Sequence, residues 1–254
     1  MASSALRPRS ATEIVDASFQ ILRAHYAQFV MCSALAYLPW LVLELLFLSD
    51  PLRWADAGIW VGVLAGIGVW TTFALMSSVI LTCASQAYLG DTVDVSSAVR
   101  RAMPRLPRVM ICAVLRYLLM MLGLLFFLVG ALYMAARLFA LTAAIILEDA
   151  SVGQAFARST QLANGRKWHI LNTLGLVAII YWVIAAGISL LSLTAGSFIV
   201  QAMAGACYTI LAYPVIAITE CLLYYDARIQ AEGLDIEMMA AELDSSSSAG
   251  TVTR

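Results

Sequence analysis

Charged residues are scarce in this chain. Only 12% of its 254 residues are Asp, Glu, Lys or Arg, whereas 62% are hydrophobic. A soluble domain carries roughly 25% charged and 45–50% apolar residues, and a soluble fold of this size could not bury so much apolar surface in one core. The scarcity of charge excludes an ordinary soluble domain and indicates that lipid surrounds most of the chain.

Residues typical of metal, redox and catalytic centres are also few. The chain has two histidines, and its five cysteines lie in apolar stretches without a Cys-x-x-Cys pair, so we expect neither a metal site nor disulfides. It has no Walker loop, no His-Glu-x-x-His motif and no nucleophile–base arrangement. We therefore expect no catalytic residues and no cofactor. The net charge of -1 gives no reason to expect a nucleic-acid partner.

Long apolar runs are what the sequence has instead. A helical span needs about 20 mostly apolar residues, and six segments qualify: about 26–48, 57–85, 108–128, 131–147, 168–193 and 198–225. A single helix from Arg108 to Leu147 would be roughly 60 Å long, twice the membrane core. We therefore expect a turn at Val129–Gly130. The sequence predicts an all-α integral membrane protein with six transmembrane helices.

Basic residues give the expected orientation. Arginine and lysine cluster before the first span, between the second and third, and between the fourth and fifth, whereas the opposite loops hold only Arg53. Because such residues concentrate in cytoplasmic loops, we expect both termini in the cytoplasm. The spans then form three hairpins within a membrane domain of residues 1–228. The polar residues 229–254 are expected to be a partly disordered cytoplasmic tail.

Each expected hairpin is preceded by a short amphipathic segment, at about 11–24, 94–103 and 150–164. Apolar residues recur three and four positions apart on one face of each, which is typical of a helix. Ser10 and Glu13 form a capping box that would start the first one. We expect three cytoplasmic amphipathic helices that lie either in the lipid interface or beneath the spans as a cap.

Four charged residues fall within the spans: Glu44, close to the outer end of the first, and Arg116, Arg137 and Glu220. The helical rise puts the last three roughly 12, 16 and 9 Å from the inner boundary, which is close enough in depth for one polar cluster. Charged residues inside a membrane usually face protein or water. The cluster is either a charged cavity for a proton, an anion or a lipid head group, or an ion pair that fixes helix packing.

Two further residue sets have candidate roles. The first consists of charged residues at the cytoplasmic ends of the spans, where a salt-bridge network could link the last span to the third amphipathic helix: Glu148, Arg158, Arg166, Asp226 and Arg228. The second consists of glycines spaced four apart on the second span, Gly58, Gly62 and Gly66. This spacing lets helices approach closely, either within the chain, as we favour, or at a homodimer seam.

Three stretches, at about 7–19, 137–168 and 222–237, carry a resemblance to a known family. The most specific is Tyr224-Tyr225-Asp226-Ala227-Arg228, which closes the last span. Together they resemble the membrane domain of some glycerophosphoryl diester phosphodiesterases and its stand-alone bacterial relatives. The resemblance implies a six-span fold in a bacterial plasma (inner) membrane. It implies no phosphodiesterase activity, because the catalytic domain of those enzymes has no counterpart in this sequence.

These observations favour a non-enzymatic membrane scaffold or accessory protein. Membrane lipids are the expected partners. A second copy of this chain and another membrane protein are the candidate protein partners. A competing hypothesis is a small transporter or lipid-handling protein that uses the cluster of Arg116, Arg137 and Glu220.

Overall fold

The structure, a computed structural model, describes residues 9–49 and 58–232. Every regular element in these two ranges is a helix. Six helical stretches are long and apolar enough to cross a membrane, namely Tyr26–Ser49, Ile59–Leu89, Val95–Leu124, Phe127–Glu148, Lys167–Leu193 and Phe198–Ala231. The chain is therefore a multi-pass helical membrane protein. The expected tail of residues 229–254 lies outside the described residues from position 233 onward.

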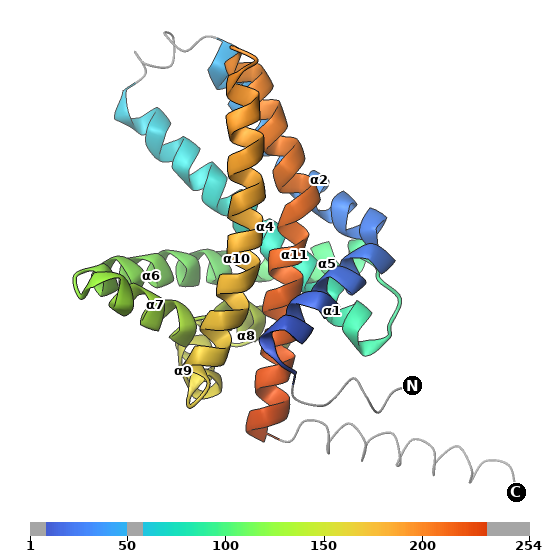
Figure 1. Cartoon of the computed structure of the whole chain (residues 1–254), viewed down its shortest axis with the longest axis vertical. Helices are drawn as coiled ribbons and strands as arrows, with labels where there is room; N and C mark the ends of the chain where they lie inside the picture. The colour runs from blue at the N-terminus through green and yellow to red at the C-terminus, as the bar shows by residue number, and fades with distance from the viewer. Residues whose placement is uncertain (1–8, 50–57, 233–254) are drawn as a thin grey trace, which may run out of the picture.

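Four long helices form the centre of the molecule (Figure 1). They are α2 (Tyr26–Ser49), α4 (Ile59–Leu89), α10 (Lys167–Leu193) and α11 (Phe198–Glu232). Helix α11 packs against the other three. Apart from a few polar and charged residues, these helices are apolar around their whole circumference, which is the pattern of helices surrounded by protein and lipid. Gly90 ends α4 with a φ of 81°, a left-handed conformation that glycine adopts without strain.

The three amphipathic segments are helices, and their apolar faces lie against the long helices. They are α1 (Ala11–Ala24), α5 (Val95–Ala102) and α9 (Val152–Ala163). Capping boxes start α1 and α9, and Asp94 caps α5. Helix α1 packs on α10 and α11, α5 on α4, and α9 on α8 and α11. Because protein covers these faces, the structure favours the cap over helices that lie free in the interface.

The contact between α1 and α11 is polar as well as apolar. Ile14 and Ser18 of α1 are fully buried, and the Thr219 hydroxyl of α11 donates to the Ser18 hydroxyl at 3.0 Å. The segment before α1 is held too, since the backbone N–H of Arg9 donates to the Asp226 carboxylate at 2.8 Å. The described start of the chain thus packs on its last helix.

The third and fourth spans are divided differently from the expectation. After a short 3₁₀ turn (Met103–Arg105), the chain forms α6 (Leu106–Leu124), α7 (Phe127–Arg137) and α8 (Leu141–Glu148). The turn between the spans is at Leu125–Phe126, so the prediction of Val129–Gly130 is wrong. Phe127 has a φ of 59°, an uncommon left-handed conformation for this residue type.

Gly130 has a different use from the one expected. A Cβ atom on Gly130 would lie 2.2 Å from the carbonyl oxygen of Gly123, and a Cβ on Gly123 would lie 2.8 Å from the Gly130 backbone. The two glycines therefore face each other and bring α6 and α7 into backbone contact. The turn that joins α6 to α7 lies on the side away from α10 and α11 (Figure 1). The side chains of this turn are highly exposed, with Phe126 at 75% and Phe127 at 83%, as expected of side chains that face lipid.

A break between α7 and α8 interrupts the fourth span. Leu138, Phe139 and Ala140 are non-helical and almost completely buried. Ser159 of α9 bonds the backbone groups that the break leaves free. Its hydroxyl donates to the Arg137 carbonyl at 2.9 Å and accepts from the Ala140 N–H at 3.1 Å. Irregular backbone within an apolar span is tolerated where protein surrounds it and its polar groups are bonded. Helix α9 thus supports the span directly.

The glycines of α4 do not bring helices together within the described chain. A Cβ atom on Gly58, Gly62 or Gly66 would meet no atom within 4 Å. The favoured interpretation of these residues as packing positions inside the chain is therefore wrong. Close approach on this helix occurs instead at Gly68, where a Cβ would lie 3.0 Å from the Trp40 ring. Regular spacing alone does not say which side of a helix faces protein.

Candidate functional site

Glu148, the last residue of α8, is the centre of a charged network. The Arg158 Nε of α9 donates to both of its carboxylate oxygens, at 3.0 and 2.9 Å, and Nη2 donates at 2.8 Å. The Arg228 Nε of α11 lies 3.7 Å from the same carboxylate. The Tyr224 hydroxyl of α11 also donates to it. One carboxylate, with a side chain only 24% exposed, therefore joins three helices.

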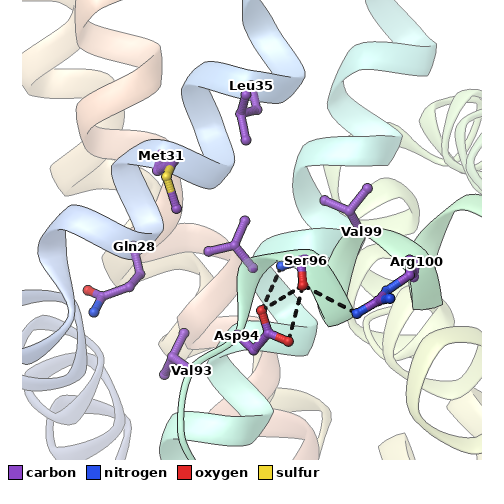
Figure 2. Close-up of a pocket in the computed structure, with 9 residues that line it drawn as sticks. Gln28, Met31, Leu35, Val93, Asp94, Ser96, Val99 and Arg100 are labelled. Carbon is purple, nitrogen blue, oxygen red and sulfur yellow. Dashed lines mark hydrogen bonds between the residues drawn. The ribbon is translucent and has the colours of Figure 1, made fainter.

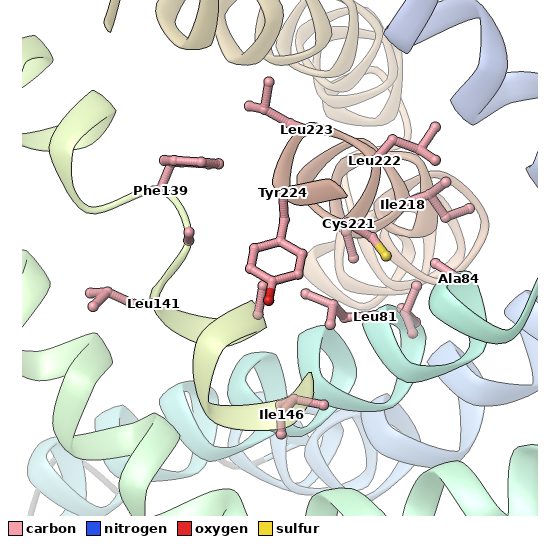
Figure 3. Close-up of a cluster of buried hydrophobic side chains, with 14 of the residues drawn as sticks. Leu81, Ala84, Phe139, Leu141, Ile146, Ile218, Cys221, Leu222, Leu223 and Tyr224 are labelled. Atoms are coloured by element: carbon pink, nitrogen blue, oxygen red, sulfur yellow. The ribbon is translucent and has the colours of Figure 1, made fainter. Parts of the chain in front are cut away.

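Tyr224 connects this network to the apolar core. Its side chain is fully buried, and Figure 3 shows its ring among apolar side chains of α4 and α8, including Leu81 and Ile146, with the hydroxyl turned toward α8. A buried tyrosine needs a partner for its hydroxyl, and Glu148 supplies it. The polar network and the core are therefore continuous, so a change in one should affect the other.

A second network surrounds Asp226, whose side chain is 4% exposed. Its carboxylate accepts from the Arg9 N–H at 2.8 Å and from the Gln230 side chain at 2.7 Å. His169 Nε2 of α10 lies 3.3 Å from the same carboxylate but lacks hydrogen-bond geometry. Gln230 in turn accepts from Arg166 Nε at 3.0 Å. This second network joins the segment before α1 to α10 and α11.

The five expected network residues thus divide between two carboxylates. Arg158 and Arg228 surround Glu148, whereas Arg166 reaches Asp226 only through Gln230. Sequence reasoning missed further members: Arg9, His169, Tyr224 and Gln230. The helical i, i+4 spacing could have found two of them, because Tyr224 shares a face with Arg228, and Gln230 shares one with Asp226.

The three intramembrane charges do not form one cluster through direct contacts. The Arg116 guanidinium acts electrostatically on Glu220, and the Thr142 side chain of α8 is within reach of that carboxylate. No salt bridge joins Arg116 to Glu220 in the described ranges, and Glu220 Oε1 is buried without a hydrogen-bond partner. Arg137 instead donates from Nε to the Thr160 hydroxyl at 3.3 Å. The expected depths do not relate the three charges, because the fourth span breaks after Arg137, whose side chain lies beside Lys167 at the start of α10.

Two hollows on the surface of the described chain differ in their lining. The larger, 730 Å³, lies between α2 and α5 (Figure 2). Its walls are largely apolar, with Met31, Leu35 and Val99 among them. Its acidic residue, Asp94, is committed to the helix cap, since it accepts from the Ser96 N–H at 2.9 Å. These hydrogen bonds lower the pKa of Asp94. The groove therefore offers apolar surface rather than a free charge.

The smaller hollow, 310 Å³, is polar and lies where α7, α9 and α10 meet. Two cations line it, Arg137 from the end of α7 and Lys167 from the start of α10. The other lining residues are neutral and can form hydrogen bonds: Tyr133, Thr160, Gln161 and Asn164. Lys167 Nζ lies 3.2 Å from the Tyr133 hydroxyl and 4.4 Å from the centroid of its ring. The hollow therefore has a positive charge.

Asp149 ties the start of α6 to the link between α8 and α9. Its carboxylate accepts from Arg105 Nε at 3.0 Å and from Arg108 Nη2 at 2.9 Å. These two guanidinium groups hold the pKa of Asp149 below its usual value. Asp149 also has a φ of 56°, a conformation that asparagine tolerates as well as aspartate does. An Asp149→Asn variant therefore removes the charge while it keeps the backbone.

We expect Asp149→Asn to lower the thermal unfolding midpoint in detergent by about 1–2 °C near neutral pH. The folded-state pKa of Asp149 lies below the unfolded value of about 3.9. Its stabilisation is therefore complete above that value and is lost as the pH falls through the folded-state pKa. Melting curves at several pH values should show a constant difference between the proteins above pH of about 5 that shrinks below about 4. A difference that persists unchanged in strong acid would contradict this.

No protein-family model, curated protein or solved structure matches the chain.

Proposed function

We propose that the chain is a non-enzymatic scaffold or accessory protein of a bacterial plasma membrane. In this proposal the six spans form three hairpins, each entered from a cytoplasmic amphipathic helix, and both termini are cytoplasmic. The arginine-rich loops support this orientation. The Tyr224–Arg228 motif resembles that of the phosphodiesterase membrane domains, and this resemblance supports a location in a bacterial plasma membrane.

One observation carries the scaffold role. The Glu148 and Asp226 networks lie together at the C-terminal end of α11, where they bond α8, α9, α10, α11 and the segment before α1 to one another. Charged groups that are bonded across several helices in this way hold the helices in place. They favour a rigid surface made by α1 and α9 over a reaction centre, which needs a group free to exchange a proton or bind a substrate.

The orientation is tested by labelling single cysteines in a cysteine-free background. A cysteine at Ser151, exposed at the start of α9, should react with an impermeant maleimide only after the inner membrane is opened. A cysteine at Thr194, exposed between α10 and α11, should react in intact spheroplasts. The reverse pattern would overturn the proposed orientation.

The competing candidate is a small transporter or lipid-handling protein, and Glu220 is the observation that favours it. This carboxylate has a buried oxygen without a partner and a positive charge, Arg116, nearby. Proteoliposomes separate the two candidates. A scaffold should give proton and ion fluxes no greater than those of empty vesicles. A pH-dependent flux that Glu220→Gln abolishes would replace the scaffold proposal with transport.

A further inference from the structure

The polar hollow between α7, α9 and α10 contains two cations and no acid. Within the described residues, neither Arg137 nor Lys167 is paired with a carboxylate. Lys167 donates to the Tyr133 hydroxyl at 3.2 Å, and Arg137 acts electrostatically on the same hydroxyl. Two positive charges beside one neutral hydroxyl repel each other at short range. An anion between them would relieve this repulsion and accept hydrogen bonds from both.

The remaining lining residues suit a tetrahedral oxyanion. Arg137 uses its Nε for Thr160, and its two terminal nitrogens form a planar fork that matches phosphate oxygens. Gln161 and Asn164 add side-chain amides, and both are exposed at the rim. Lys167 is the first residue of the 27-residue helix α10, whose N-terminus has no side-chain cap. The positive end of that helix dipole adds to the charge of the two cations.

The surroundings of the hollow indicate where the anion comes from. Trp168, next to Lys167, is 80% exposed, and Tyr133 is 41% exposed. Exposed tryptophan and tyrosine at the end of an apolar span are typical of the interface where lipid head groups lie. The mostly apolar part of α10 begins at Ile170, and side chains further along it, such as Ile179 and Val183, are exposed. A phosphate held here would therefore sit at head-group level, with apolar surface of α10 available to acyl chains.

We propose that Arg137 and Lys167 form a binding site for the phosphate group of an anionic phospholipid. Its volume of 310 Å³ accommodates a phosphate and a small esterified alcohol. The same chemistry would take free inorganic phosphate, and the two sources are separable by experiment. The site does not rest on the scaffold role, and the flux measurement in proteoliposomes leaves it untouched.

The test is lipid binding by native mass spectrometry on the purified chain in mild detergent. Wild-type protein should bind phosphatidylglycerol more tightly than diacylglycerol, which lacks the phosphate. The variant Arg137→Gln/Lys167→Gln should weaken phosphatidylglycerol binding about tenfold or more, because two charge-assisted contacts are lost. Binding of diacylglycerol should stay the same. Lys167→Arg keeps the charge and should retain most of the affinity.

A matched control removes two positive charges elsewhere. Arg100 and Arg101 are exposed on α5 and outside the hollow. Their double replacement by glutamine should change phosphatidylglycerol affinity by no more than about twofold. Equal loss in both double variants would overturn the site, because it would show a general charge effect. Wild-type binding of diacylglycerol as tight as that of phosphatidylglycerol would also overturn it.

Free phosphate is the second arm of the experiment. Millimolar inorganic phosphate is added to delipidated protein, and the thermal unfolding midpoint is measured. If phosphate raises the midpoint of the wild type but not of Arg137→Gln/Lys167→Gln, the site also takes the free ion. If inorganic phosphate leaves the midpoint of the wild type unchanged while phosphatidylglycerol binds, the lipid head group is the ligand. If the double variant does not fold, the comparison of Lys167→Gln with Lys167→Arg decides, and equal lipid affinity in these two would refute the proposal.

Discussion

Glu148→Gln is expected to destabilise the folded chain by about 2–3 kcal/mol. The change leaves Arg158 and Arg228 without their shared carboxylate and weakens the bond to the buried Tyr224 hydroxyl. Removal of one partner from a buried ion pair costs about 3–5 kcal/mol, and we expect less here because Glu148 is 24% exposed. The free energy of unfolding, measured by titration with a denaturing detergent, gives the result.

Two comparisons isolate the effect of the Glu148 network. Asp16→Asn removes an exposed acid of α1 and should change the unfolding free energy by less than about 0.5 kcal/mol. The double variant Glu148→Gln/Arg158→Gln should lose less than the sum of its two single variants, because both single variants break the same contact. Strict additivity would show that the contact between Glu148 and Arg158 contributes nothing of its own.

Gly130→Val is expected to cost about 3 kcal/mol or more, and to reduce the yield of folded protein. The first carbon of any side chain at this position would lie 2.2 Å from the Gly123 carbonyl oxygen. Because the obstacle is backbone, α6 and α7 must separate, and neither side chains nor lipid can relieve the clash. The yield of monodisperse protein in size-exclusion chromatography and the thermal midpoint measure the effect.

Gly62→Ala is the matched control for Gly130→Val. A Cβ at Gly62 meets open space, and alanine favours a helix over glycine by up to about 1 kcal/mol. We therefore expect neutral or slightly higher stability. Gly130→Ala should already be harmful, with Gly130→Val worse. Normal folding of both Gly130 variants would mean that α6 and α7 do not touch through their backbones.

The class of fold and most helix positions could be predicted because lipid imposes a simple rule on composition. A run of apolar residues long enough to cross the membrane must be helical, and the runs at 26–48 and 168–193 correspond to α2 and α10. The fourth span was harder to predict. The glycine at 130 is compatible with a turn and with a close helix contact, and only the opposing Gly123 decides between them. Leu138-Phe139-Ala140 contains no helix-breaking residue, so nothing local predicts its break.

The candidate site shows a similar limit. The charges at the span ends could be listed from the sequence because each is conspicuous in an apolar chain. Their partners could not, since Ser159, Thr160 and Gln230 are ordinary polar residues until the fold places them beside a charge or a broken helix. The interpretation of Arg137 as a partner of Glu220 failed for the same reason. Its contacts depend on the position of α9, which depth within the membrane does not determine.

The packing of α1 on α11 has a consequence for the order in which the protein forms. The ribosome makes Ile14, Ser18 and the segment at Arg9 about 200 residues before Thr219 and Asp226, with which α1 and that segment bond (sequence separations of 201 and 217). Until α11 is made, the apolar face of α1 that packs on it is uncovered. We expect this face to bind the membrane surface during that time. Helix α1 can pack on α11 only after α11 is made, so a late step of assembly joins two segments that are far apart in the sequence.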